Sequence, residues 1–345
     1  MKYIFLLMLT LWHFLSFCQF NEVIFKDKKG SELLSLIVGQ YKTTTVLSYN
    51  DARNQLWANM AKRNNDSLKC VYSGYTIYLN PNSSDPKGDA YSKDIDCEHT
   101  WPQSLGAEGD AKSDMHHLFP TWTNANSGRG NLAFKEIPDN ETDIWYRNKK
   151  TITTIPVNNI TEYSEKDNNG WFEPREDHKG NVARALVYFY TMYKSQADQS
   201  FWSKQINTLY QWHYLDPVDA AEWARNDFIA SKQGGKKNPF IVDSTLFRRA
   251  YFPQYKDTVS SSLAESQNTI CVSVSNGFLS IKLIDNNPVL DLAIYNINGL
   301  MIYQKCFNQN HFYVSLNEFP EGFLIYKIRS NENVKSGIII NRFSN

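Results

Sequence analysis

The amino-terminal half of the chain alternates between helical and extended hydrophobic patterns. From residue 31 to 62, apolar residues recur at helical spacing between charged ones, with an interruption at Thr43–Thr45. This pattern predicts two helices. From Cys70 the chain alternates β-branched and aromatic residues and then becomes rich in turn formers up to Asp89, which predicts a short strand followed by a surface loop. Residues 135–177 are polar and Asn-rich, and we expect loops and short strands there.

Two later segments carry stronger helical patterns. Residues 181–195 place their large apolar side chains along one helical stripe, so we expect a helix with one face on the core. The stripe consists of Val182, Leu186, Phe189, Tyr190 and Tyr193. The next helix is predicted to start with Asp216 as N-cap, Pro217 at the first helical position and Asp219 at N3. The Gly234–Gly235 pair predicts its end.

The carboxy-terminal quarter of the chain is extended throughout. Residues 256–268 are polar and read as a linker. Beyond them, Asn276–Gly277 and Asn298–Gly299 each stand between β-rich runs, which is the strongest short-range indication of a hairpin. We therefore predict a small antiparallel β-sandwich over 269–345. Together with a helix-rich domain over 20–255, the expected fold class is α+β.

The amino terminus has the pattern of a secretory signal peptide. One Lys precedes an apolar run that ends near Phe17, too short for a comfortable membrane span. We predict a signal peptide over 1–19, with cleavage between Phe17 and Phe20, and a membrane anchor is the alternative. A lipid anchor on Cys18 is disfavoured because Phe17 is not small. We expect an exported protein without stable membrane insertion.

Composition and charge exclude some classes of protein. A chain of 345 residues with 42% hydrophobic residues can form a substantial core, which excludes global disorder. The formal net charge of +0 argues against a protein that holds nucleic acid by charge alone. Any phosphate contact must therefore be local or made through a metal.

Export also changes how the cysteines are read, because thiols outside the cytosol tend to be paired. Cys70 and Cys97 lie in the first region, and Cys271 and Cys306 lie in the last. Each region has enough cysteines for one disulfide, although spacing alone establishes neither pairing. A zinc site at Cys97 beside His99 is the alternative, but the chain contains no Cys-x-x-Cys pair.

Three neighbouring segments concentrate residues that are suited to phosphodiester chemistry. They are DCEHTWPQS at 96–104, SDMHHLFP at 113–120 and NANSGRGN at 124–131. In an extended segment, Glu98 and His99 leave on opposite faces, so that one can bind metal while the other faces water.

Phosphodiester hydrolysis needs a base, a hard cation and a group that stabilises charge in the transition state. His99, a metal pair made of Glu98 and Asn131, and Arg129 fit these roles in that order. Oxygen ligands favour Mg²⁺, with Mn²⁺ or Ca²⁺ as alternatives, over zinc.

These segments resemble the endonuclease I family of secreted or periplasmic nucleases, which are His-Me finger (ββα-metal) nucleases. The likeness spans roughly residues 90–245 and includes EHTWPQS, SDMHHLFP, RGN, KGNVARALVYFYTMY, WHYLDPVDAAEWARNDFIA and KKNPFI. The resemblance implies a general base at His99, metal ligands at Glu98 and Asn131, and a DNA and/or RNA substrate cut with little sequence specificity. One branch of the family has Asn where this chain has His117.

Five further residues are candidates for support or substrate contact. Asp114, His116 and His117 either orient the site or belong to the core at a helix start. Trp122, in an expected loop between the base and metal segments, is a candidate substrate contact. Arg184 is a candidate phosphate contact, with an ion pair as the alternative.

The last segment, with YNINGLMIY, LNEFPEGFLIYKI and IIINRF, is similar to the C-terminal sorting domain of the type IX secretion system. This likeness implies the secretion machinery as a partner and an extracellular or cell-surface location. An ordinary β-module that binds glycan or protein is the alternative. We expect a monomer.

Two functions other than a nuclease are alternatives for this sequence. The first is a catalytically silent secreted protein that binds nucleic acid or a surface on the same fold. The second, a metallopeptidase, is disfavoured because the chain contains no His-Glu-x-x-His motif.

Overall fold

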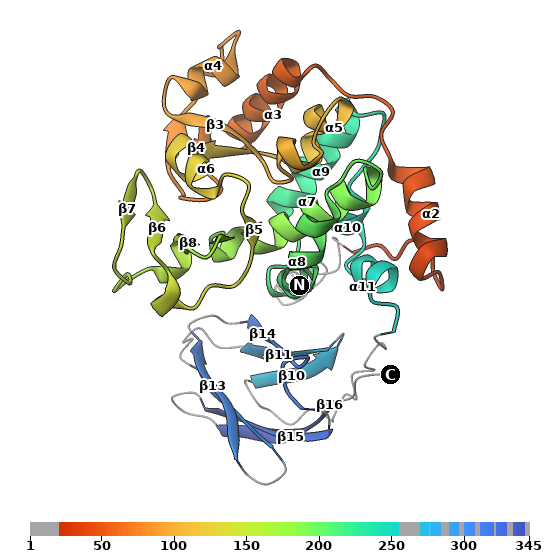
Figure 1. Cartoon of the computed structure of the whole chain (residues 1–345), viewed down its shortest axis with the longest axis vertical. Helices are drawn as coiled ribbons and strands as arrows, with labels where there is room; N and C mark the ends of the chain where they lie inside the picture. Colours follow the sequence, from red (N-terminus) through yellow and green to blue (C-terminus); the bar gives the residue numbers. More distant parts are fainter. Residues whose placement is uncertain are drawn as a thin grey trace, which may run out of the picture. The chain divides into compact units, whose positions relative to one another are not determined.

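The computed structural model describes residues 21–254 and most of 270–341 (Figure 1). The gaps in the second range are residues 276, 284–289, 297–299, 308–310, 321 and 330–333. The chain divides into two compact units, Met1–Ala250 and Tyr251–Asn345, which are described separately. The predicted signal peptide and linker lie outside the described residues. No described helix is both long enough and apolar enough for a membrane span.

Helices dominate the described part of the first unit. The α-helices are α2 (Gly30–Tyr41), α3 (Tyr49–Arg63), α4 (Pro86–Tyr91), α5 (Asp110–Ser113), α6 (Thr123–Arg129), α7 (Lys179–Met192), α8 (Gln199–Leu215), α9 (Ala220–Lys232), α10 (Pro239–Val242) and α11 (Leu246–Tyr251). The 3₁₀ turns are η1 (Gln103–Leu105), η2 (Met115–His117), η3 (Asp139–Glu141), η4 (Ile160–Glu162) and η5 (Glu176–His178). The two predicted amino-terminal helices are confirmed as α2 and α3, while α4 lies within the segment predicted to be a loop, and α8 was not predicted.

Helix α7 is the centre of the first unit. It packs against α8, α10, α2 and η2, and Figure 1 shows it surrounded by the other helices. Almost every side chain along it is buried, including Lys179 and Arg184. The predicted helix is confirmed, and its apolar stripe is buried, but burial extends around the helix because polar residues of α7 are enclosed in ion pairs.

The start of α9 also differs from the prediction. Asp219 is the N-cap, and its carboxylate accepts a hydrogen bond from the Glu222 N–H at 2.7 Å. Asp216 instead ends α8, and its carboxylate accepts from the Gly180 N–H at 2.9 Å. The predicted end is confirmed, since Gly234 and Gly235 follow α9 with positive φ.

Short strands surround this helical core. The strands of the first unit are β1 (Ser67–Lys69), β2 (Thr76–Tyr78), β3 (Ile95–His99), β4 (Leu118–Trp122), β5 (Ala133–Phe134), β6 (Ile144–Arg147), β7 (Lys150–Ile152), β8 (Ser164–Lys166) and β9 (Trp171–Glu173). β1 pairs with β2, β3 pairs with β4, and the other five form a sheet in the order β5-β9-β8-β6-β7. The expectation of short strands over 135–177 is confirmed.

The element that positions the candidate site is the succession β3, β4, α6. β3 and β4 are antiparallel, with Glu98 opposite Phe119 and His99 opposite Leu118. Helix α6 packs on both strands (Figure 1), and the Asn126 side chain donates to the Cys97 carbonyl at 3.3 Å. Glu98 and His99 therefore lie at the end of a buried strand that is held by a helix.

The described part of the second unit is a seven-stranded antiparallel sandwich. Its strands are β10 (Ile270–Ser275), β11 (Phe278–Leu283), β12 (Leu290–Asn296), β13 (Met301–Phe307), β14 (His311–Ser315), β15 (Gly322–Arg329) and β16 (Val334–Asn341). One sheet has the order β10-β11-β14 and the other β13-β12-β15-β16. Leu279 and Ile281 from the first sheet share a core with Leu292 and Ile294 from the second. The predicted β-sandwich and both predicted hairpins are confirmed.

Candidate active site

Glu98 is a buried carboxylate with two partners on one oxygen. Its Oε1 accepts a hydrogen bond from the Tyr72 hydroxyl at 2.8 Å and lies 2.9 Å from Nη1 of Arg129. Burial raises the pKa of Glu98, and Arg129 and Tyr72 act against that shift by stabilising the carboxylate. Among the described residues, Oε2 of Glu98 has no hydrogen bond or ion pair, so it remains available as a ligand.

Arg129 is 1% exposed and ties the candidate site together. Its Nη1 also donates to the His99 carbonyl at 3.0 Å, and its Nη2 donates to the Thr100 carbonyl at 2.7 Å. The guanidinium lies 4.6 Å from the centre of the Phe134 ring. With its donors used in this way, Arg129 fixes the end of β3 and the Glu98 carboxylate, and these contacts favour a positioning role over phosphate contact.

His99 has both ring nitrogens engaged in a way that fixes its tautomer. Nε2 lies 3.0 Å from the Lys112 carbonyl, which can only accept, so Nε2 carries the proton. Nδ1 lies 3.3 Å from the side-chain amide nitrogen of Gln103, a donor, so Nδ1 carries the lone pair. Burial lowers the pKa of His99 to about 3, with a further contribution from His117. His99 is therefore neutral, with Nδ1 as its accepting atom.

Three residues that the sequence patterns did not single out surround His99. The Tyr49 ring lies 5.3 Å from the His99 ring. The Arg53 guanidinium lies 4.0 Å and the Lys112 ammonium 5.0 Å from the Tyr49 ring centre. These two cations are partly exposed and lie beside the base, whereas Arg129 is enclosed. Only the helical spacing of Tyr49 and Arg53 was visible in the sequence.

Asn131 lies just beyond α6 and is exposed. Its side-chain Nδ2 donates to the Ser104 hydroxyl at 2.8 Å, which leaves its carbonyl oxygen Oδ1 without a partner among the described residues. Ser104 also lines a hollow of about 500 Å³ together with Glu108 and Asp198. Glu98 and Asn131 thus each keep one oxygen free, and two free hard oxygens fit Mg²⁺, Mn²⁺ or Ca²⁺ better than a soft metal.

Asp114 holds the turn that precedes β4. Its carboxylate accepts from the hydroxyls of Tyr188 and Tyr193, both at 2.8 Å, and from the Gln233 amide at 2.9 Å. Burial acts to raise its pKa, but His116 and the hydrogen bonds from Gln233 and the His116 N–H outweigh it, and the pKa is lowered. The carboxylate is thus an anchor for η2 rather than a free ligand.

His116 and His117 follow Asp114 and are buried. Nε2 of His116 lies 3.0 Å from the Lys236 carbonyl, and Nε2 of His117 lies 2.7 Å from the Ala111 carbonyl. Burial lowers the pKa of both. The His117 ring lies 5.4 Å from the His99 ring. Of the two, only His117 contacts a candidate catalytic residue.

Two candidates for substrate contact lie inside the protein instead. Trp122 is 7% exposed and ends strand β4, so the loop expected there was wrong. Arg184 forms a buried bidentate pair with Glu222, with distances of 2.8 and 2.7 Å. The ion-pair alternative therefore describes Arg184, which joins α7 to α9.

A second acidic cluster lies apart from these residues. The carboxylates of Glu136, Glu173 and Glu176 have oxygens within 4.8 Å of one another. The Lys179 ammonium lies among them, 3.0 Å from Glu136, 2.7 Å from Glu173 and 2.7 Å from Glu176. Its burial acts to lower the pKa of Lys179, but the three carboxylates raise it well above its usual range. A buried lysine already neutralises this cluster, which makes it a poor metal site.

The cysteines do not form the disulfides considered above. Cys70, Cys97 and Cys306 are free thiols. The Cys70 sulfur accepts from the Trp122 N–H at 3.0 Å, and burial raises the pKa of Cys97 to about 12. Neither the Cys70–Cys97 nor the Cys271–Cys306 pairing is present, since Cys70, Cys97 and Cys306 are all free.

Comparison with known proteins gives relatives for the first unit. Two extracellular ribonucleases are similar to this chain. The protein from Bacillus subtilis (strain 168) is 29% identical over 239 residues, which is 63% of this chain and 73% of the relative. The protein from Bacillus amyloliquefaciens is 27% identical over 245 residues, which is 64% of this chain and 75% of the relative.

Among solved structures, an immunoglobulin-like β-sandwich protein of the DUF3244 family from Bacteroides vulgatus ATCC 8482 matches 25% of this chain and 98% of its own. The identity is 15% and the TM-score 0.22, a value too low to support an argument. The family described as Endonuclease I, in contrast, matches residues 28–245, which is more than half of the chain. This chain belongs to the endonuclease I family.

Proposed function

We propose that the protein is an exported, metal-dependent nuclease that hydrolyses phosphodiester bonds of DNA and RNA with little sequence specificity. The observation that carries the proposal is the neutral His99, whose Nε2 is held by the Lys112 carbonyl and whose Nδ1 accepts from the Gln103 side-chain amide at 3.3 Å, a donor that a water molecule can replace. A neutral imidazole of this kind, which directly follows the Glu98 carboxylate in β3, is suited to hydrolysis at phosphorus. The family match and the two extracellular ribonucleases support it.

In the proposed mechanism, Nδ1 of His99 takes a proton from a water molecule, and the resulting hydroxide attacks phosphorus. Glu98 Oε2 and Asn131 Oδ1 would hold the cation. When bound, a divalent cation would neutralise charge on the phosphate and on the leaving 3′ oxygen. Arg129 and Tyr72 keep the Glu98 carboxylate oriented through Oε1.

The proposed substrate range follows from the nucleophile. Because His99 acts on water, the reaction does not need the 2′-hydroxyl of RNA, so DNA should be cut as well. The described residues of the first unit contain no long basic helix of the kind that reads base sequence, which supports nonspecific cutting.

We further propose, from the sequence likeness alone, that the second unit is a sorting module for the secretion machinery and that the nuclease acts outside the cell. Deletion of residues 269–345 should then leave the protein in the cell. If the truncated protein is still exported, the unit is an ordinary binding module.

The direct test of the nuclease is gel digestion of plasmid DNA and total RNA with Mg²⁺, with EDTA, and by the His99→Ala variant. We expect degradation with Mg²⁺ alone and intact nucleic acid in both controls. Intact nucleic acid in every lane of folded protein would favour the alternative, a catalytically silent binding protein.

A further inference from the structure

A hollow of about 540 Å³ lies between the β1–β2 turn and the β6–β7 hairpin. It contains none of the residues assigned above to the catalytic site. Its walls include two tyrosines and three basic residues: Tyr75, Tyr163, Arg147, Lys149 and Lys150. In a chain of zero formal net charge, such a local group of cations and rings is the kind of surface that binds nucleic acid.

Each ring in the hollow has a cation beside it. The Lys149 ammonium lies 5.4 Å from the Tyr75 ring centre, and the Arg147 guanidinium lies 5.6 Å from the Tyr163 ring centre. Arg147 is also paired with Glu162, with its Nη2 at 2.6 Å from the carboxylate. The Arg147 charge is therefore largely used within the protein.

The two lysines are less constrained. Lys149 pairs with Asp94, but both side chains are 49% exposed. An ion pair so open to water is weak and can exchange for a phosphate. Lys150 is exposed and has no ion pair among the described residues. Lys149 and Lys150 are thus the cations available to a ligand.

The floor of the hollow is rigid. Asn148 and Gly74 form a β-bridge, and Gly74 has a φ of +71°. A Cβ at Gly74 would lie 2.1 Å from Nη1 of Arg175, so only glycine fits beneath that guanidinium. Asp177 holds Arg175 through two hydrogen bonds of 2.9 and 3.0 Å.

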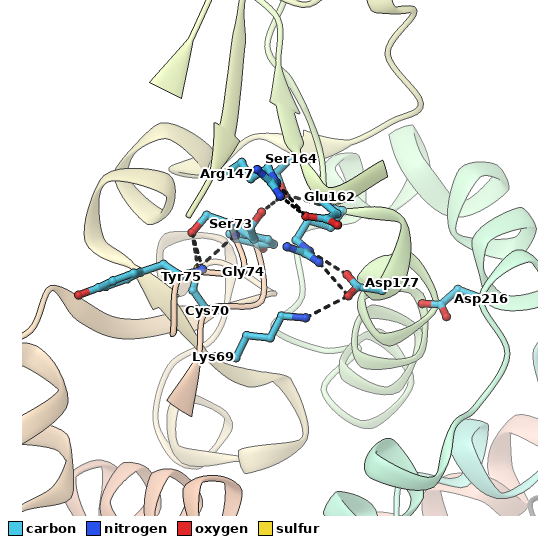
Figure 2. A network of polar contacts seen from close by, with 12 residues as sticks. Lys69, Cys70, Ser73, Gly74, Tyr75, Arg147, Glu162, Ser164, Asp177 and Asp216 are labelled. Carbon is cyan, nitrogen blue, oxygen red and sulfur yellow. Dashed lines mark hydrogen bonds and ion pairs between the residues drawn. The ribbon is translucent and has the colours of Figure 1, made fainter. Parts of the chain in front are cut away.

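The backbone next to Gly74 connects the hollow to the candidate active site. Ser164 donates to the Tyr72 carbonyl at 2.6 Å, and Tyr72 in turn donates to Glu98. Figure 2 shows Tyr75 extending away from the Ser73–Gly74 backbone. Two residues therefore separate Tyr72, which orients the proposed metal ligand, from Tyr75, whose ring lines the hollow.

We propose that this hollow binds a single-stranded segment of the nucleic-acid substrate, with a base stacked on Tyr75 and phosphates contacting Lys149 and Lys150. The inference rests on the proposed nuclease function and names a substrate class for it. A tyrosine face accepts any base, but only an unpaired base exposes its own face, so a duplex cannot use the site in this way.

The test is fluorescence anisotropy with labelled 12-nucleotide single-stranded RNA and DNA, using the full chain carrying His99→Ala in EDTA so that nothing is cut. Tyr75→Leu should weaken binding by at least about fivefold, whereas Tyr75→Phe, which keeps the ring, should bind like the parent. Tyr91→Leu, at another exposed tyrosine outside the hollow, is the matched control.

The lysines are tested through salt dependence. Lys149→Gln with Lys150→Gln should reduce the slope of log affinity against log salt by about 1.4, because each phosphate contact to a single strand contributes about 0.7. Lys62→Gln with Lys204→Gln, two exposed lysines outside the hollow, should leave the slope unchanged.

Binding that is unchanged in Tyr75→Leu and in the double lysine variant would overturn the inference, and so would an equal loss for a blunt duplex of the same length. Cleavage by the wild-type chain is measured in parallel. If the wild type cleaves nucleic acid and the variants bind like the parent, the subsite is ruled out and the proposed nuclease function stands. Tyr75-dependent binding without any cleavage by the wild type supports the subsite and contradicts the proposed function.

Discussion

The Glu98 carboxylate and the Arg129 guanidinium lie 2.9 Å apart, with side chains only 2% and 1% exposed. An arginine enclosed in this way cannot move out to a substrate without leaving a buried charge behind. The pair joins the end of strand β3 to the end of helix α6, and its geometry sets the direction in which the free Oε2 of Glu98 faces.

Arg129→Gln should therefore destabilise the protein by about 3–5 kcal/mol, because a buried carboxylate loses its partner. Urea denaturation would measure the change in the free energy of unfolding. Lys28→Gln is the matched control, since Lys28 pairs with Glu32 on the surface with 44% and 62% exposure. Its removal should cost less than about 1 kcal/mol. Equal losses in the two variants would contradict the positioning role of Arg129.

Tyr72→Phe removes one hydroxyl, the donor to Glu98 at 2.8 Å. We expect a loss of about 1.5–3 kcal/mol of stability, as for a hydrogen bond to a charged group, and a higher Mg²⁺ concentration for half-maximal cleavage. A magnesium titration of the initial rate measures the second effect. Tyr78→Phe, at a 61% exposed tyrosine, should change neither quantity. If Tyr72→Phe needs the same magnesium concentration as the wild type, the result would contradict a role of Glu98 in metal binding.

His213 gives a pH prediction that is independent of the site. Burial, with a contribution from Arg184, lowers the pKa of His213 from 6.5 to about 3. Below pH 6.5 the unfolded chain takes up a proton at His213 that the folded chain does not, so its contribution to stability falls as pH decreases toward 3. Between pH 7 and pH 5 the fall is about 2 kcal/mol.

The measurement compares wild type with His213→Gln, which can still donate to the Ser244 carbonyl that lies 2.8 Å from Nε2 in the wild type. All other titrating groups are common to the two proteins, so the difference between their unfolding free energies isolates His213. That difference should shift by about 2 kcal/mol in favour of the variant at pH 5. A constant difference would mean that the pKa of His213 is the same in the folded and the unfolded chain.

The thiols predict a simple labelling pattern. Cys70 and Cys97 are buried and Cys306 is exposed, so a thiol reagent should modify Cys306 rapidly in the native protein and the other two only after unfolding. Mass spectrometry of peptides locates the label, which should appear on the Cys306 peptide of the native protein and not on the Cys70 or Cys97 peptides. A Cys70–Cys97 disulfide in the native protein would contradict the structure.

The sequence pattern predicted those structural elements that are determined by residues close together in the sequence. The interruption between α2 and α3, the Gly234–Gly235 helix end and the two Asn-Gly hairpins all follow from neighbouring residues. Asp216 and Asp219 are both good N-cap residues, and the choice between them depends on the Gly180 N–H, a contact across 36 positions. The surroundings of Cys70 likewise depend on distant residues, since its sulfur accepts from the Trp122 N–H, 52 positions away.

The candidate site, too, could be predicted from the sequence only in part. The order of Glu98, His99 and Asn131 was readable in the segments themselves. The contacts that orient them were not, because Tyr72 lies 26 positions from Glu98 and Arg129 lies 30 positions from the carbonyl of His99. Arg184 has an ion pair with Glu222, 38 positions away, and no helical pattern identifies such a partner.

The central claim is that Nδ1 of His99 is the general base, and the most direct measurement is the single-turnover cleavage rate of His99→Ala together with its Mg²⁺ affinity by calorimetry. The account predicts a rate lower by about 10²–10⁴-fold with Mg²⁺ affinity near that of the wild type, while His311→Ala, in the second unit, cuts at the wild-type rate. Cleavage by His99→Ala at the wild-type rate would contradict the account.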